Sequence, residues 1–267
     1  MATPETITSA ANPLLQDVRR AIARGGLTAR GWCVAETFHL LEEALGSECE
    51  VKVVLAAGSV RSAAEALVGH RAGVKFVVVP DALMQKVSAT ETSQGVVTLV
   101  RPPEWTIGQL LVGRALVVAL DAIQDPGNAG AILRAAEAFG ATGAIFLKGS
   151  VSTYNPKTLR ASAGSLFRVP FLHGLDTAAV LASLQQNHLC LYAAVPAREG
   201  KAARLPAEAD FTASCALIIG NEARGVCPVL RAAALDVSIP TAGVESLNAA
   251  VAAGILLYEA RRQRTAA

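Results

Sequence analysis

The second half of the sequence contains three loops in which amide, carboxylate, hydroxyl and guanidinium groups follow closely after apolar runs. Side chains of these types can orient a nucleophile, hold a polar ligand or stabilise charge that develops during a reaction. They also have ordinary structural uses in turns and helix caps. The residues that stand out, in chain order, are Asn128, Arg134, Glu222, Ser246 and Asn248.

The first loop belongs to the stretch DAIQDPGNAGAILRAAEAFG, residues 121–140. Asp-Pro-Gly-Asn is a turn sequence, and Asn128 is expected to cap the helix that follows it. The glycines lack G-x-G-x-x-G spacing, and the next strand ends in Leu-Lys-Gly with no acidic residue to bind a ribose. A dinucleotide-binding dehydrogenase is therefore disfavoured. For Arg134, a solvent-facing role without chemistry remains open.

The second and third loops each leave one residue with more than one interpretation. Glu222, in IIGNEARGV, can be a turn residue, an ion-pair partner of Arg224 or part of a site. In the third loop, Ser246 or Glu245 is expected to cap the long apolar helix by accepting backbone N–H bonds. That cap accounts for one polar residue but leaves Asn248 without a structural role.

The elements that must position these loops alternate between strands and helices. Helices are predicted at 129–140 and around 155–166, and apolar runs predict strands at 115–120, 143–147, 188–195, 215–220 and 235–240. This alternation is typical of a parallel sheet covered on both faces. Ligands of such sheets bind at the carboxyl ends of the strands, where the three loops begin.

The first half of the sequence predicts a separate small α/β domain over residues 1–100. Helices are expected at 12–30, 35–46, 59–70 and from 81, and strands at 51–57, 74–80 and 94–100. The stretch 101–113 has two prolines and no clear period, which predicts a linker. Residues 114–267 then form the second domain.

Composition excludes several classes of protein. With 267 residues, 52% of them apolar and 17% charged, the chain is globular. No apolar run approaches the roughly 18 residues of a membrane span, and the N-terminus lacks the pattern of a secretory signal. Five scattered cysteines without a C-x-x-C pair argue against a disulfide framework or a zinc site and fit a reducing cytoplasm. No metal ion is expected.

The net charge of +2 gives no strongly basic field, but arginines cluster locally. Arg19, Arg20, Arg24 and Arg30 share one N-terminal stretch. Three more arginines, near the end of the last helix, can equally complement the helix dipole. Nucleic-acid binding is one interpretation of these charges, and a solvated surface is the other.

Together, the stretches DAIQDPGNAGAILRAAEAFGA, LIIGNEARGV and VSIPTAGVESLNAAVAAGILLYEARRQR resemble, in order and spacing, the three signature motifs of the SpoU (TrmH-like) ribose methyltransferases of the SPOUT class. The resemblance covers residues 115–264. Residues 1–100 look like the substrate-binding domain that precedes the catalytic domain in many rRNA-directed members, although Glu36-Thr37 stands where those proteins commonly have Glu-Gly.

The resemblance implies a small N-terminal α/β RNA-binding domain followed by a Rossmann-like parallel-sheet domain with a deep trefoil knot (an α/β knot). In that family the knot loops hold S-adenosylmethionine, and a homodimer completes each active site. The positions that match those holding the adenosine are Gly220, Ile239 and Leu247. The apolar helix 249–258 would be buried between the knot and the partner subunit. Thr241 departs from the methionine common in the third motif.

The implied reaction transfers the sulfonium methyl group to a ribose 2′-hydroxyl of RNA. Arg134 matches the family's catalytic arginine, although a guanidinium ordinarily keeps its proton to above pH ~12. Either a nearby cation and desolvation turn Arg134 into a base, or it stays charged, grips the adjoining phosphate and stabilises the developing alkoxide. Asn128 would orient Arg134 or the ribose, and Glu222 would bind a hydroxyl or amide or balance positive charge. Ser246 and Asn248 would order the cofactor or substrate.

Other functions remain as alternatives to an rRNA methyltransferase. The substrate-like N-terminal domain favours rRNA over tRNA, and a protein that kept the fold but only binds RNA is the alternative from another class. A hydrolase is disfavoured because no G-x-S-x-G elbow is present and the histidines lie near none of the three loops.

Overall fold

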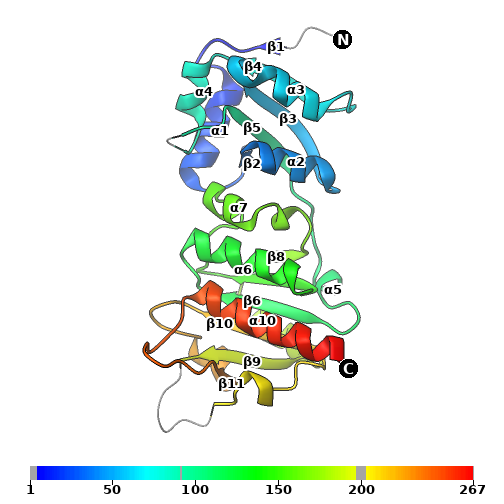
Figure 1. The fold of residues 1–267 in the computed structure, drawn as a ribbon, viewed down its shortest axis with the longest axis vertical. Coiled ribbons are helices and arrows are strands. Elements are labelled where there is room, and N and C mark those ends of the chain that lie inside the picture. Colours follow the sequence, from blue (N-terminus) through cyan, green and yellow to red (C-terminus); the bar gives the residue numbers. More distant parts are fainter. Residues whose placement is uncertain (1–4, 91, 197–202, 267) are drawn as a thin grey trace. The chain divides into compact units, whose positions relative to one another are not determined.

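The computed structural model describes residues 5–90, 92–196 and 203–266 (Figure 1). By packing, the chain falls into two units: unit 1 is Met1–Glu104 with Tyr154–Arg168, and unit 2 is Trp105–Thr153 with Val169–Ala267. The boundaries at 100 and 114 stay predictions. The segment Tyr154–Arg168 packs with the N-terminal part of the chain, which a division into two consecutive domains does not include.

Unit 1 contains a mixed sheet with the strand order β1-β4-β3-β5-β2. The strands are β1 (Glu5–Thr6), β2 (Cys33–Glu36), β3 (Glu50–Ala57), β4 (Lys75–Val79) and β5 (Val96–Arg101). β1, β4 and β3 pair in parallel, whereas β5 runs antiparallel to both β3 and β2. The helices are α1 (Pro13–Arg24), α2 (Phe38–Gly46), α3 (Arg61–Val68), α4 (Asp81–Val87) and α7 (Pro156–Ser162).

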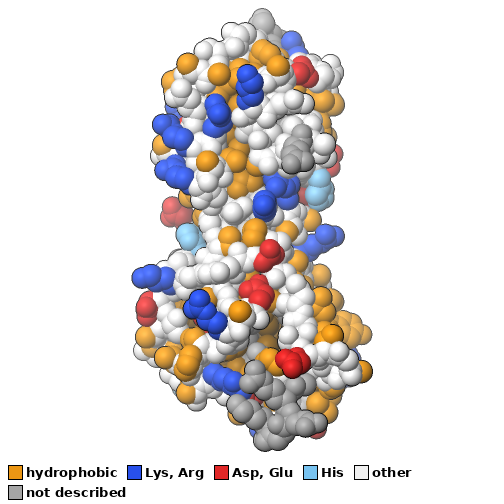
Figure 2. Space-filling model, turned by 90° about the vertical axis from the view of Figure 1, so that its left-hand side faces the viewer, with side chains coloured by type: hydrophobic (Ala, Val, Ile, Leu, Met, Phe, Trp, Pro, Cys, Tyr) orange, Lys and Arg blue, Asp and Glu red, His pale blue; other side chains and the backbone are white. Residues whose placement is uncertain are grey.

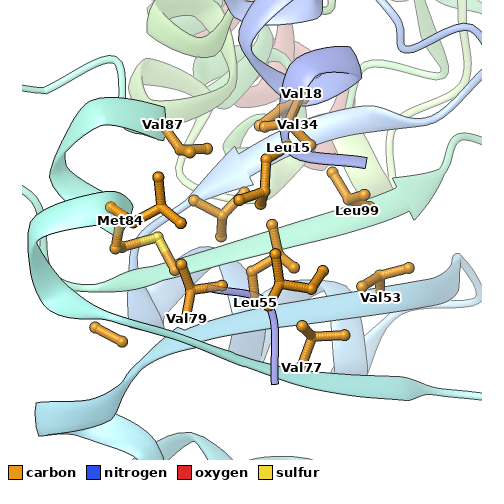
Figure 3. Packing of buried hydrophobic residues seen from close by; sticks show 14 of the residues in the cluster. Leu15, Val18, Val34, Val53, Leu55, Val77, Val79, Met84, Val87 and Leu99 are labelled. Carbon is orange, nitrogen blue, oxygen red and sulfur yellow. The ribbon is translucent and has the colours of Figure 1, made fainter. Parts of the chain in front are cut away.

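A core of aliphatic side chains joins α1 and α4 to this sheet (Figure 3). Leu15 and Val18 of α1 lie on one face of the helix, and Met84 and Val87 of α4 lie beside them, packed toward apolar side chains of the strands. Burial of such side chains stabilises by about 1.5–3 kcal/mol each. The apolar face of α1 therefore fixes which of its residues remain on the surface.

Two predicted helices of unit 1 are shorter than expected. The helix predicted at 12–30 ends at Arg24, because Gly25 takes a left-handed conformation (φ 61°) and closes the helix. The helix predicted at 35–46 begins only at Phe38. The residues before it form the buried strand β2, which pairs with β5, and so short an apolar run does not reveal its period.

Unit 2 contains a parallel sheet, as predicted, of six strands among the described residues, with the order β11-β9-β10-β6-β7-β8. The strands are β6 (Leu116–Asp121), β7 (Gly143–Leu147), β8 (Phe171–Leu175), β9 (Cys190–Val195), β10 (Cys215–Gly220) and β11 (Leu235–Ser238). β8 was not predicted, because its half-exposed edge position lets His173 and Gly174 interrupt the apolar pattern.

Helices cover the sheet of unit 2 and complete its connections. They are α5 (Ile107–Leu110), α6 (Pro126–Ala138), α8 (Thr177–Gln186), α9 (Pro228–Ala232) and α10 (Ala249–Ala266). α10 packs against α6 and β10, so the C-terminal helix returns to the centre of the sheet (Figure 1). The predicted linker 101–113 holds the short helix α5, whose Leu110 is fully buried. Among the described residues, no helix has both the length and the apolar character needed to cross a membrane.

Candidate active site

The first two loops leave adjacent strands of the unit 2 sheet. β6 and β10 pair in parallel, and their last residues, Asp121 and Gly220, lie opposite each other. The first two loops therefore begin side by side at the carboxyl ends of these strands, where ligands of parallel sheets bind. The sheet register therefore brings together two of the three predicted loops.

Asp125 caps the helix of the first loop, and the expectation that Asn128 does so is wrong. The Asn128 backbone N–H donates to Asp125 Oδ1 at 2.7 Å, and Pro126 occupies the first helical turn, where no N–H is needed. Because Asp125 already satisfies the helix end, the side-chain amide of Asn128 is available for other contacts.

Asn221, which sequence reasoning missed, builds the second loop. Its Nδ2 donates to the carbonyl oxygen of Ala122 at 2.9 Å, and its Oδ1 accepts from the N–H groups of Ala223 and Arg224 at 3.0 and 3.1 Å. An asparagine directly after a strand-ending glycine is the signal that identifies such a turn.

Gly220 has no room for a side chain. A Cβ atom there would lie 2.2 Å from the backbone of both Gly225 and Val226. The loop therefore folds back directly on the end of β10. Glu222 stands exposed at its tip, and within the described part of the chain it forms no ion pair with Arg224.

Asn248 caps α10, so the expectation that Ser246 or Glu245 does this is wrong. Asn248 Oδ1 accepts from the N–H groups of Ala250 and Val251 at 2.9 and 3.2 Å. The helix begins at Ala249, which makes residue 248 the capping position, and asparagine is among the preferred caps.

The three loops meet through a chain of side-chain hydrogen bonds centred on Asn128. Asn248 Nδ2 donates to Asn128 Oδ1 at 2.9 Å, and Asn128 Nδ2 donates to Glu222 Oε1 at 2.8 Å. These partners are 120 and 94 residues apart in the sequence. The cap fixes Asn248 Oδ1 as an acceptor, so the direction of every bond in the chain follows from it.

Arg134 and Ser246 are not joined to this hydrogen-bond chain. Arg134 lies further along α6 with its side chain exposed, and among the described residues its guanidinium has no hydrogen bond or ion pair. The exposed side chain of Ser246 likewise has no partner in the described structure. Of the five residues singled out by type and spacing, the structure connects Asn128, Glu222 and Asn248 directly.

The third loop is closed by Thr241, whose Oγ1 donates to the carbonyl oxygen of Val244 at 2.6 Å. Ile239 and Leu247, at the two ends of this loop, lie outside helices and strands and are partly exposed. Gly220 ends β10 and Ile239 directly follows β11, so both lie at the carboxyl ends of strands of the unit 2 sheet.

Asp121 is a second residue that sequence reasoning missed. It is 5% exposed, and its Oδ2 accepts from the backbone N–H of Cys227 at 2.6 Å, which ties the end of β6 to the segment after the second loop. Burial, above all, raises the pKa of the Cys227 thiol, so a thiolate nucleophile is disfavoured there. Within the described residues, no group of His, Cys, Asp and Glu side chains is placed to hold a metal ion.

Comparison with known proteins matches both halves of the chain. Residues 115–258 match the SpoU rRNA Methylase family, and residues 12–98 match the MRM3-like substrate binding domain. The 23S rRNA (guanosine(2553)-2′-O)-methyltransferase RlmP of Bacillus subtilis is 30% identical, over 96% of this chain and 98% of the relative. The uncharacterized tRNA/rRNA methyltransferase slr1673 of Synechocystis is 35% identical, over 98% of this chain and 95% of its own length.

A solved structure has the same fold over nearly the whole chain. The SpoU methyltransferase AviRb from Streptomyces viridochromogenes, in complex with the cofactor AdoMet, superimposes with a TM-score of 0.83 at 27% identity. The match covers 96% of this chain and all of that protein. With its motifs joined at one sheet edge and matched over residues 115–258, the chain belongs to the SpoU rRNA methylase family.

Proposed function

We propose that this protein transfers a methyl group from S-adenosylmethionine to a ribose 2′-hydroxyl of RNA, with rRNA as the substrate. The observation that carries the proposal is the hydrogen-bond chain Asn248–Asn128–Glu222, which joins the three sequence motifs. The names of the relatives support rRNA, because RlmP and the RlmB proteins are 23S rRNA 2′-O-methyltransferases.

The proposed cofactor pocket consists of Gly220, Ile239 and Leu247. The backbone groups of all three residues and the partly exposed side chains of Ile239 and Leu247 suit the adenosine part of S-adenosylmethionine. When bound, this cofactor supplies an electrophilic methyl group on a sulfonium. The residues of the chain then have to bind the ribose, align its 2′-oxygen and stabilise the charge that develops on it.

Arg134 is proposed to act as a charged stabiliser. Its side chain is exposed in the single chain, and among the described residues its guanidinium has no hydrogen bond or ion pair. A charged, unpaired guanidinium can bind a neighbouring phosphate in a bidentate manner. It would thereby hold the nucleotide and stabilise the developing alkoxide.

Asn128 and Glu222 are proposed to position the ribose. Glu222 accepts from Asn128 through one carboxylate oxygen, which leaves the other oxygen available to a hydroxyl group. Asn248 holds Asn128 in place and caps α10 at the same time. Ser246 is exposed and stands two residues before Asn248 in the sequence, and it would order the cofactor or substrate.

The proposal includes the family's trefoil knot, a homodimer and a cytoplasmic location. α10 returns from the edge strand β11 to pack on α6 and β10, a route that supports the knot. Val251, Ile255 and Tyr258 of α10 are 50%, 38% and 57% exposed and follow helical spacing, which supports burial by a second copy. The five cysteines are free thiols, as suits a reducing compartment.

The test is methyl transfer from labelled S-adenosylmethionine to unmodified 23S rRNA and to tRNA, followed by digestion to nucleosides. The wild type should produce a 2′-O-methylnucleoside from rRNA, and Arg134→Ala should lower the rate by about 10²–10³-fold. Arg134→Lys keeps the charge but loses the bidentate fork, so it should retain part of the activity.

Arg114→Ala is the matched control, because Arg114 is also exposed but precedes β6, at the opposite end of that strand from the site. It should leave the rate unchanged. If the folded wild type yields no 2′-O-methylnucleoside from either RNA, the proposed reaction is wrong. Methylation of tRNA alone would overturn the rRNA assignment.

A further inference from the structure

Six cations of unit 1 are paired with five glutamates, because Glu50 holds both Lys52 and Arg101. The pairs are Lys52–Glu50 at 2.5 Å, Arg61–Glu65 at 2.9 Å, Lys75–Glu5 at 2.6 Å, Arg101–Glu50 at 2.9 Å, Arg160–Glu36 at 3.1 Å and Arg168–Glu43. A cation held by a carboxylate contributes little attraction to a distant anion, because the two charges cancel. The six cations and five glutamates carry a net charge of only +1, so most of the positive potential of unit 1 comes from other residues.

A second set of exposed cations in unit 1 lacks such partners. Within the described residues, no ion pair is formed by Arg19, Arg24, Arg30, Lys86 or Lys157. Arg20 approaches Asp17 only at 4.0 Å. Asp17 is itself 9% exposed, and both of its oxygens accept from the Ala29 N–H at 3.0 and 3.1 Å. The Asp17 carboxylate therefore binds the backbone of the loop after α1.

Arg20 and the unpaired cations lie on elements that contact one another. Arg19, Arg20 and Arg24 belong to α1, and α4, which carries Lys86, packs against α1. Gly25 directly follows Arg24 at the C-terminal end of α1, and a Cβ on Gly25 would lie 2.8 Å from Asn155 Nδ2. Asn155 caps α7, so the start of α7, which carries Lys157, lies against this end of α1. Figure 2, which faces the side of α1 and α4, shows basic side chains with few acidic ones among them.

Arg30 is held in place before any ligand binds. Its guanidinium lies over the Trp32 ring, 5.2 Å from the ring centroid. The Trp32 backbone N–H donates to Thr28 Oγ1 at 3.1 Å, and the Thr28 N–H donates to the Trp32 carbonyl at 2.9 Å, so the loop is cross-linked. A preplaced guanidinium loses less conformational entropy when it binds an anion.

We propose that these six cations form an RNA-binding surface, which we call the α1 basic surface: Arg19, Arg20, Arg24, Arg30, Lys86 and Lys157. They bind phosphates of the RNA substrate, while the glutamate-paired cations of unit 1 do not. The inference rests on the proposed function, because it assigns the surface to the same RNA that is methylated. Phosphate binding of this kind fixes the position of an RNA without reading its sequence.

The test compares two variants that remove the same number of charges from unit 1. The first is Arg20→Gln/Arg24→Gln/Arg30→Gln, and the control is Arg61→Gln/Lys75→Gln/Arg101→Gln. The affinity of the full chain for an unmodified 23S rRNA transcript is measured over a range of salt concentrations. The first variant should bind at least about tenfold more weakly, with a salt slope shallower by about 2–3 for three lost phosphate contacts.

The control variant should keep the affinity and salt slope of the wild type. The first variant should also keep its rate of methyl transfer at saturating RNA, because its substitutions lie outside the catalytic site. If both variants bind as the wild type does, or weaken equally, the α1 basic surface is wrong while the proposed function stands. If the wild type neither binds nor methylates rRNA, both proposals fail together.

Discussion

Two polar clusters join distant parts of the sequence, one in each unit, and they differ in burial. In unit 1, Glu36 is 3% exposed and accepts from the Ala89 N–H at 2.6 Å and from Arg160 Nη1 at 3.1 Å, across 53 and 124 residues of sequence. In unit 2, Asn128, Glu222 and Asn248 form a hydrogen-bond chain at the surface, in which Glu222 and Asn248 are exposed and Asn128 is half-buried.

The difference separates a cluster that maintains the fold from one that is available to a ligand. A buried carboxylate without its partners costs several kcal/mol, so Glu36 depends on both contacts for the stability of unit 1. Hydrogen bonds between exposed groups contribute only about 0.5–1.5 kcal/mol, because water competes for the same groups. The Asn128 cluster can therefore exchange its contacts for those of a substrate at little cost.

The largest expected effect is on stability, from Arg160→Met. This change removes the cation and leaves Glu36 buried with one partner, which should lower the free energy of unfolding by about 3 kcal/mol. Chemical denaturation measures it, with Arg61→Met as the control, because the exposed Arg61–Glu65 pair is worth about 0.5 kcal/mol at most. Equal losses in the two variants would show that burial does not distinguish the Glu36 cluster.

Asn128→Ala is the converse change, in the exposed cluster. It removes both side-chain hydrogen bonds and should lower methyl transfer by about tenfold to a hundredfold. The free energy of unfolding should fall by about 1 kcal/mol, the low end for two hydrogen bonds whose groups water can reach. Asn187→Ala, which removes an exposed amide bonded to the Ser183 carbonyl, should leave transfer unchanged. A large loss of stability with normal transfer would assign the Asn128 cluster to the fold instead.

The smallest expected effect is a gain in stability from Thr37→Gly, next to Glu36. Thr37 has φ 116° and ψ 151°, a conformation that favours glycine, and its Oγ1 accepts from the Leu40 N–H at 3.2 Å. Relief of the strain should exceed the few tenths of a kcal/mol lost with the cap, a net gain of about 1 kcal/mol. Denaturation should rank glycine above threonine and Thr37→Ala below both, and any other order would argue against strain at this position.

The sequence predicted the parallel sheet and the three loops at strand ends, because apolar period and turn residues are local signals. The caps of α6 and α10 were predicted wrongly. A cap can be assigned only when the first residue of the helix is known, and the sequence pattern does not locate that residue. The meeting of Asn128 with Glu222 and Asn248 could not be derived from spacing, because it depends on how the strands pair.

The same limit applies to unit 1. Strand β2 pairs with β5 from Cys33 opposite Val100 to Glu36 opposite Val97, more than sixty positions along the chain, so no local pattern reveals this partner. The neutralised and unpaired arginines also look alike in the sequence. Only their contacts separate Arg160, bonded to Glu36, from Arg24.

The packing of Tyr154–Arg168 with unit 1 has a consequence for modularity. This segment lies between β7 and β8, so the chain passes from one unit to the other three times, at 104–105, 153–154 and 168–169. A single cut in the 101–113 stretch would not produce two self-sufficient fragments. A C-terminal fragment would carry the apolar residues Leu159, Leu166 and Phe167 without the rest of their unit, whereas an N-terminal fragment would lack Arg160. The two halves of this protein must therefore be expressed and engineered together.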